Sequence, residues 1–163
     1  MQVTDLNLEI AAVAKRLERE GRYAHTHDFV QHGGVSVYEH CVRVAALSCR
    51  LAAAFGAEVD RDSLIRGALL HDYFLYDWHE KDDSHRLHGF THPRAALRNA
   101  MQDWDLDEVE QNVILRHMFP LTPVPPACTE AWLVCLADKM CAAVQEMVYT
   151  RARRLRPALA RSK

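Results

Sequence analysis

Residues 67–72 read Gly-Ala-Leu-Leu-His-Asp, an apolar run that ends in two side chains able to bind a metal ion. Helical spacing of the preceding apolar residues predicts that His71 and Asp72 both lie at the edge of a core. A second pair, His27 and Asp28, lies in a polar stretch, so the dipeptide alone is a weak signal. The apolar context makes His71 and Asp72 the stronger candidates, because a buried polar group without a partner costs several kcal/mol.

Three other polar side chains fall on the apolar faces of expected helices. His40, His117 and Asp138 each align with apolar residues three or four positions away. A lone inward histidine is usually a hydrogen-bonded core residue, and a lone inward aspartate usually has an arginine, a helix cap or a metal as its partner. Together with His71 and Asp72, they favour a shared cation over a buried hydrogen-bonded network. Mixed imidazole and carboxylate ligands suit iron, manganese, zinc or nickel.

The composition is that of an ordinary globular protein. The chain has 163 residues, of which 49% are hydrophobic and 26% charged, with a net charge of −2. This length suits one domain, and the small net charge favours neither nucleic acid nor a membrane as partner. Apolar runs fall short of the roughly 20 residues that cross a bilayer, and we see no signal-peptide core, so we expect a cytoplasmic protein. Five cysteines without Cys-x-x-Cys spacing predict free thiols.

Helical periodicity covers most of the chain, and strand-like alternation is nearly absent. We therefore predict an all-α, single-domain helical bundle of about six or seven helices over residues 1–163. The expected helices are 5–20, 36–55, 61–74, 93–103, 106–118 and 129–150. Residues 75–92 form the longest stretch without predicted structure, and such a loop is often functional. Residues 1–30 should form a helix and loop, and residues 151–163 a basic tail that frays into solvent.

The phrases that carry the candidate ligands resemble those of a known superfamily. They are Tyr38-Glu39-His40, Leu69-Leu70-His71-Asp72 and Ala137-Asp138-Lys139, spread over consecutive expected helices. This series resembles the HD-domain metal-dependent phosphohydrolases over about residues 31–146. The stretch 87–93, Leu-His-Gly-Phe-Thr-His-Pro, is similar to small, poorly characterised bacterial HD hydrolases.

The resemblance implies an HD-type helical bundle that binds one or two divalent transition-metal ions. Its first metal site would consist of His40, His71, Asp72 and Asp138. His92 and His117 resemble the extra histidines of the dinuclear branch, in which Asp72 would bridge to a second ion. The chain departs from the dinuclear signalling phosphodiesterases after Asp72, where Tyr73-Phe74 replaces Ile-Gly-Lys, and Met118 follows His117 where some relatives have a second histidine.

The resemblance implies hydrolysis of a nucleotide or another small phosphoester, a monoester or a diester, by metal-bound hydroxide. A metal lowers the pKa of bound water from about 15.7 towards 7, and two ions can clamp the attacking and leaving oxygens. Two other classes stay open. Some similar HD-fold proteins use a di-iron pair to activate oxygen, and His92 and His117 are compatible with that chemistry. A non-catalytic binding module would usually lack the ligands present here. The oligomeric state is not predicted.

Further residues are weaker candidates. Lys139 could reach a substrate phosphate, or its stem could simply pack on the helix. Asp77 could protonate the leaving group, although a solvated loop acid is more common. The weak candidates for substrate binding are Arg66, His88 and Arg94.

The loop histidines and aromatic residues allow several roles. His88 could replace His92 as a ligand or support it, and Gly89 and Pro93 argue against one continuous helix through both. His32 could cover the site. An aromatic wall that stacks on a base, or plain core, could be formed by Tyr73, Phe74, Tyr76, Trp78 and Phe90.

Overall fold

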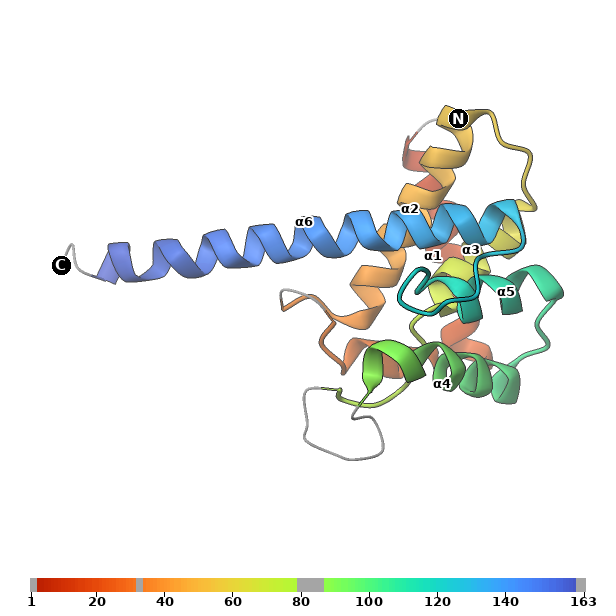
Figure 1. The fold of residues 1–163 in the computed structure, drawn as a ribbon, viewed down its shortest axis with the longest axis horizontal. Helices are drawn as coiled ribbons and strands as arrows, with labels where there is room; N and C mark the ends of the chain where they lie inside the picture. The colour runs from red at the N-terminus through yellow and green to blue at the C-terminus, as the bar shows by residue number, and fades with distance from the viewer. Residues whose placement is uncertain (1–2, 32–33, 79–86, 161–163) are drawn as a thin grey trace.

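The computed structural model describes residues 3–31, 34–78 and 87–160, and these residues form an all-helical fold (Figure 1). The described part of the chain contains six α-helices and one 3₁₀ helix: α1 Val3–Glu20, η1 Tyr23–His27, α2 Val37–Phe55, α3 Arg61–Leu70, α4 His88–Asp103, α5 Glu108–Arg116 and α6 Thr129–Ala160. The prediction of an all-α fold is confirmed. None of the described helices is long and apolar enough to span a membrane.

The core lies where α2, α3, α5 and α6 pack together, because α2 contacts both α3 and α6 while α5 joins the same two helices. Gly67 on α3 lies directly against Val113 on α5, and a Cβ on this glycine would be 3.0 Å from the Val113 Cβ. The missing side chain therefore permits a close approach of the two helices. Both helices end at a histidine, since His71 is the C-terminal cap of α3 and His117 that of α5. The rings of these two residues meet edge to face with centroids 4.8 Å apart.

Helix α3 ends at Leu70, so the predicted end at residue 74 is wrong. Asn99 on α4 donates hydrogen bonds to the carbonyls of Tyr73 and Phe74, at 3.1 and 2.9 Å, which a continuing helix would use internally. Leu75 then adopts a left-handed φ of 57°. The chain turns sharply through His71 and Asp72 instead.

Helix α4 begins at His88 and runs through Gly89 and Pro93, so the prediction that these two residues interrupt it is wrong. Pro93 lies just after the first turn, where a missing N–H removes a single helical hydrogen bond. The Leu87 carbonyl accepts from the backbone N–H groups of Phe90 and Thr91, at 2.8 and 3.1 Å, which closes that first turn.

Helix α6 extends to Ala160, so the predicted end at residue 150 is wrong and residues 151–160 of the expected tail continue the helix. Its N-terminal half packs on α2 and α5, whereas its C-terminal half projects away from the other helices (Figure 1). Residues 161–163 of the predicted tail lie outside the described residues.

Candidate metal centre

Six side chains predicted as ligands converge in the core of the bundle, and all six are buried. They come from five helices or the turns that follow them: His40, His71, Asp72, His92, His117 and Asp138. The structure therefore brings together residues that are up to 98 positions apart in the sequence.

The first group of ligand atoms surrounds one oxygen of Asp72. The Nε2 atom of His40 lies 3.0 Å from Asp138 Oδ1 and 3.7 Å from Asp72 Oδ2. The Nε2 atom of His71 lies 3.4 Å from Asp72 Oδ2 and 3.8 Å from Asp138 Oδ1. Two imidazoles and two carboxylates thus face a common point.

The second group surrounds the other oxygen of Asp72. The Nε2 atoms of His92 and His117 lie 3.2 and 3.5 Å from Asp72 Oδ1, and 2.9 Å from each other. Within each group, His40–His71–Asp72 and Asp72–His92–His117, the ligand atoms lie within 4.8 Å of one another. The Asp72 carboxylate therefore stands between two groups of histidines.

Each of the four histidines presents its Nε2 atom to the centre because its Nδ1 atom faces an oxygen. Three Nδ1 atoms lie 2.8 Å from backbone carbonyls of the preceding turn: His71 from Ala68, His92 from His88 and His117 from Ile114. The fourth, in His40, lies 3.1 Å from Oε1 of Gln145. A carbonyl oxygen only accepts, so the proton of a neutral ring resides on Nδ1 and the Nε2 lone pair is available to a metal.

This arrangement of acceptors fits a cation. The Nε2 atoms of His92 and His117 are in contact, yet two lone pairs cannot hydrogen-bond to each other. Among the described residues, buried His71 Nε2 and Asp72 Oδ1 also have no hydrogen-bond partner. Two buried acceptors that face each other are costly unless a positive charge lies between them. The observed donor set therefore fits one or two divalent metal ions.

Both carboxylates of the centre are ionised. Burial opposes the ionisation of Asp72, yet the neighbouring rings of His71 and His92 hold its pKa well below the usual range. Burial also opposes the ionisation of Asp138, but the neighbouring imidazoles of His40 and His71 hold the pKa of that carboxyl far below the usual range. Two negative charges are thus present to balance a cation.

The imidazoles differ in their protonation. Burial is the largest influence on the His71 ring and lowers its pKa, but Asp72, Cys41 and Asp138 together outweigh burial, and the pKa rises well above its ordinary value. Burial, together with the charges of His71 and His92, lowers the pKa of His117 to about 3, so this ring is neutral. A metal ion would take the place of the His71 proton, because a ligating imidazole must be neutral.

Two buried glutamines contact the candidate ligands, and the sequence analysis missed both. Gln145 accepts from His40 and lies on α6 two turns after Asp138, so helical spacing from that residue is a signal that could have identified it. Gln31 donates its side-chain N–H to Asp72 Oδ2. Its backbone is held by a 2.8 Å hydrogen bond to the Val35 carbonyl, in a loop whose conformation the sequence pattern does not reveal.

A further network anchors the residue that follows Asp72. The Tyr73 hydroxyl donates to Asp103 Oδ2 at 2.6 Å, and Arg22 Nε donates to both oxygens of that carboxylate at 3.1 and 3.0 Å. Burial and the bond to Asp103 raise the pKa of the Tyr73 hydroxyl, which therefore stays protonated as a donor. This network ties the turn after α3 to α4 and to the residue before η1.

The predicted phosphate-binding and acid–base residues lie in different surroundings. The Nζ atom of Lys139 donates to the carbonyls of His117 and Cys135, at 2.8 and 3.3 Å, so it lies next to a candidate ligand. Arg66 lies away from the six ligands in an ion pair with Glu110, at 2.9 Å. Its guanidinium therefore joins α3 to α5.

The other predicted residues surround α4. His88 Nδ1 lies 2.9 Å from the Tyr76 hydroxyl, and its ring stacks between Trp78 and His92 with centroids 5.0 and 4.5 Å apart. This position suits support of His92. Arg94 and Phe90 are exposed on α4, Asp77 is half-buried, Tyr73 and Phe74 are buried, and His32 lies outside the described residues.

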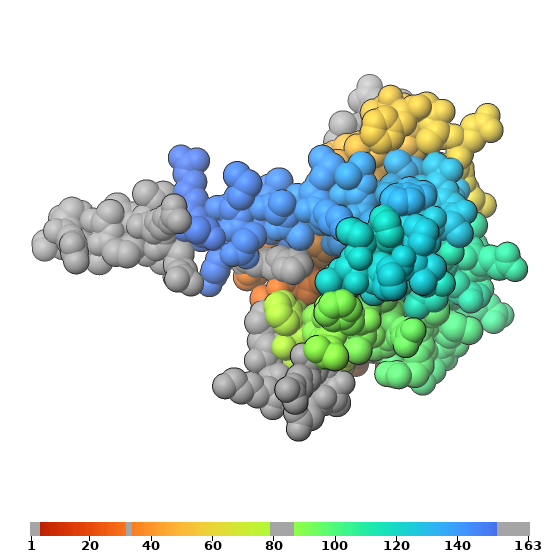
Figure 2. All heavy atoms as spheres, in the orientation of Figure 1, coloured from red at the N-terminus to blue at the C-terminus, as the bar shows by residue number. Residues whose placement is uncertain are grey.

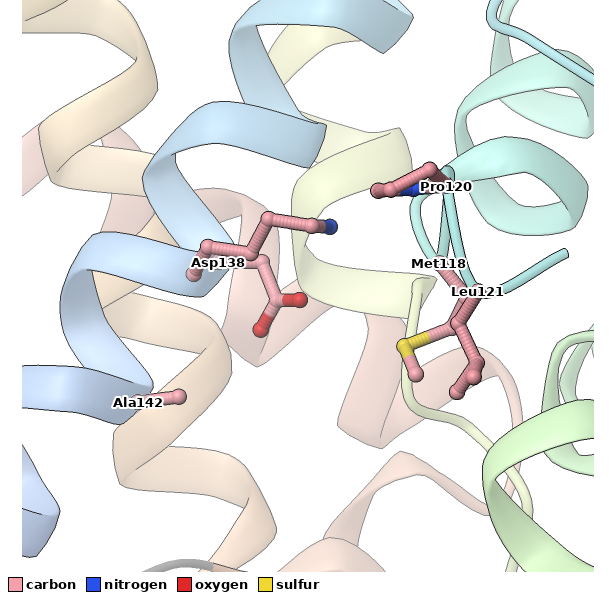
Figure 3. A pocket seen from close by; sticks show the side chains of 6 residues that line it. Met118, Pro120, Leu121, Asp138 and Ala142 are labelled. Atoms are coloured by element: carbon pink, nitrogen blue, oxygen red, sulfur yellow. The ribbon is translucent and has the colours of Figure 1, made fainter.

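A cavity of about 460 Å³ borders the centre at Asp138. Figure 3 shows Asp138 on one side of this cavity and Met118, Pro120 and Leu121 on the other. Lys139 and Ala142 also line it. Asp138 therefore connects the candidate metal ligands to a space that a substrate could occupy.

Comparison with known proteins agrees with this geometry. The HD domain family matches residues 37–143, and the chain belongs to this family. Ribonuclease Y of Pseudothermotoga lettingae is 34% identical over 110 residues, which cover 68% of this chain and 19% of that protein. Dihydroneopterin 2',3'-cyclic phosphate phosphodiesterase of Methanocaldococcus jannaschii is 27% identical over 111 residues, which cover 62% of this chain and 44% of that protein. The chain thus spans less than half the length of these two relatives. No solved structure matches the chain significantly.

Proposed function

We propose that this protein is a metal-dependent phosphohydrolase that acts on a small phosphoester. The observation that carries the proposal is the convergence of four imidazole Nε2 atoms on the two oxygens of Asp72. Membership of the HD domain family supports it. So do the names of the two relatives, a ribonuclease and a cyclic phosphate phosphodiesterase, which denote enzymes acting on phosphoesters.

One ion would be held by His40, His71, Asp72 and Asp138, and a second by Asp72, His92 and His117. Imidazole with carboxylate suits iron, manganese, zinc or nickel better than magnesium or calcium. A divalent ion there would supply a Lewis acid that lowers the pKa of water and neutralises the charge of a phosphoryl group.

The side chains of this protein contribute position and charge. The carbonyls behind the histidines fix the direction of each ring, and burial excludes bulk water from the ligands. The substrate would enter through the cavity at Asp138. Lys139 lines the same cavity, and its charge would attract the phosphate. Asp77 in the segment after α3 would supply a proton to the leaving group.

The proposal is tested by elemental analysis of the protein purified without added metal, followed by a panel of phosphomonoesters and phosphodiesters. Asp72→Ala should abolish both metal loading and turnover, because Asp72 belongs to both ligand groups. Asp62→Ala is the matched control, since Asp62 is an exposed aspartate of α3. Phosphate release by Asp72→Ala at the wild-type rate would contradict the proposal.

A second candidate function is oxygen activation by a di-iron pair. The specific observation in its favour is the placement of one Asp72 oxygen towards each of two histidine pairs. Iron in the purified protein and oxygen consumption during turnover would support it, whereas phosphate release without oxygen would exclude it. A binding module would retain metal without either activity.

A further inference from the structure

The cavity beside the metal centre has an apolar lining. Apart from Asp138 and Lys139, the described residues that line it are Met118, Pro120, Leu121 and Ala142. Met118 directly follows the candidate ligand His117, and Ala142 lies one turn after Asp138 on α6. The apolar surface of the cavity is therefore supplied by residues next to the candidate ligands. Since a water molecule occupies about 30 Å³ in the liquid, about 460 Å³ has room for an organic group.

A second cavity continues this surface along α6. Its volume is about 550 Å³, and it shares Pro120 and Lys139 with the first cavity. Figure 2 shows the segment that follows α5, in cyan, lying beside α6. Trp132 and Leu136 of α6 line the second cavity and remain 47% and 43% exposed. The two adjacent cavities form an apolar path that begins at Asp138.

Positive charge is scarce along this path. Among the described residues that line either cavity, Lys139 is the sole cation, and its Nζ atom is already bonded to two carbonyls. Arg66 is engaged by Glu110. A polyphosphate would need several cationic or backbone N–H donors for its additional charges. The lining therefore favours a substrate with little charge beyond one phosphoryl group.

From these observations we propose that the substrate is a phosphate ester of an apolar alcohol, whose hydrocarbon part lies in the cavity beside Asp138 and extends past Pro120 towards Trp132. This inference rests on the proposed function for the position of the phosphate. Burial of one methylene is equivalent to about 0.8 kcal/mol, so each added methylene should strengthen binding up to about fourfold.

The test uses n-alkylphosphonates from ethyl to decyl, whose binding to the metal-loaded protein is measured by calorimetry. These probes are not hydrolysed, so binding is measured without turnover. We expect the dissociation constant to fall severalfold with each added methylene and the butyl compound to bind more tightly than adenosine monophosphate. A dissociation constant independent of chain length, or tighter binding of the nucleotide, would overturn the inference.

Variants assign the effect to the two cavities. Leu121→Ser should reduce the gain in affinity per methylene among the short members of the series, whereas Leu136→Ser should reduce that gain only for the longer members. Leu8→Ser is the control, because Leu8 is an exposed leucine of α1 that lines neither cavity. An unchanged chain-length dependence in both cavity variants, with normal metal content, would contradict the assignment of the path.

The inference and the proposed function fail in different ways. If the protein hydrolyses other phosphoesters but the dissociation constants of the phosphonates do not depend on chain length, the inference is refuted and the proposed phosphohydrolase function stands. Chain-length-dependent binding without hydrolysis of any n-alkyl phosphate or of any other phosphoester in the panel would support the apolar path and refute the phosphohydrolase.

Discussion

Gln145 is expected to control metal affinity through the tautomer of His40. It is 4% exposed, and its Oε1 atom lies 3.1 Å from His40 Nδ1. The Nδ1 atoms of the other three histidines face backbone carbonyls, which a side-chain substitution does not remove. His40 alone therefore depends on a side chain to place its lone pair on Nε2.

Gln145→Leu removes this acceptor at nearly constant size. The alternative tautomer of His40, with its proton on Nε2, then becomes the favoured one, because its N–H can donate to Asp138 Oδ1 3.0 Å away. That tautomer has no Nε2 lone pair for a metal. Loss of a partner behind a ligating histidine typically costs 10–100-fold in metal affinity, which is about 1.4–2.7 kcal/mol. We expect a loss in this range.

The assay is a competitive titration with a chromophoric chelator, together with the visible absorption spectrum of the cobalt-substituted protein. Gln145→Glu keeps an acceptor and should retain wild-type affinity or exceed it. Gln111→Leu is the matched control, because Gln111 bonds to the Leu106 carbonyl outside the centre. If folded Gln145→Leu binds metal as tightly as the wild type, the tautomer argument is refuted.

Three other predictions concern stability. Removal of metal with a chelator should lower the melting temperature, because metal at 100 times its dissociation constant contributes about 2.7 kcal/mol; equal melting of both forms in calorimetry would contradict this. Asp103→Asn should cost about 1–2 kcal/mol in urea unfolding, since it weakens contacts with Tyr73 and Arg22. Burial raises the pKa of Asp103, but the bonds from Arg22 and Tyr73 outweigh burial and the pKa is lowered. The stability that Asp103 contributes is therefore present above about pH 4 and is lost as the pH falls through the folded pKa. The Asp103→Asn variant should lack this pH dependence of stability. Gly67→Ala should cost about 1–3 kcal/mol and weaken metal binding, because its Cβ would press against Val113; a wild-type melting temperature would refute this.

The burial and convergence of the candidate ligand residues were predictable because helical spacing determines which face a side chain shares. His40 and Asp138 align with apolar neighbours, and a buried polar group requires a partner. Helix ends were less predictable. Asn99 ends α3 from a distant helix, and α4 tolerates Pro93 close to its start, so both boundaries depend on contacts that spacing does not contain.

The supporting residues show a similar limit. Gln145 shares the spacing of Asp138 but looks like an ordinary polar residue in the sequence, because its role depends on a partner 105 positions away. Arg66 lies one turn before His71, which suggested a phosphate contact. The structure places its guanidinium against Glu110 of α5 instead, because packing of α3 on α5 brings these two charges together.

Anomalous diffraction from crystals of the metal-loaded protein would test the central claim most directly. We predict density for an ion about 2.0–2.2 Å from the Nε2 atoms of His40 and His71 and from oxygens of Asp72 and Asp138. A second ion would lie between Asp72, His92 and His117. Metal bound elsewhere on the chain, with these six side chains left without an ion, would contradict the account.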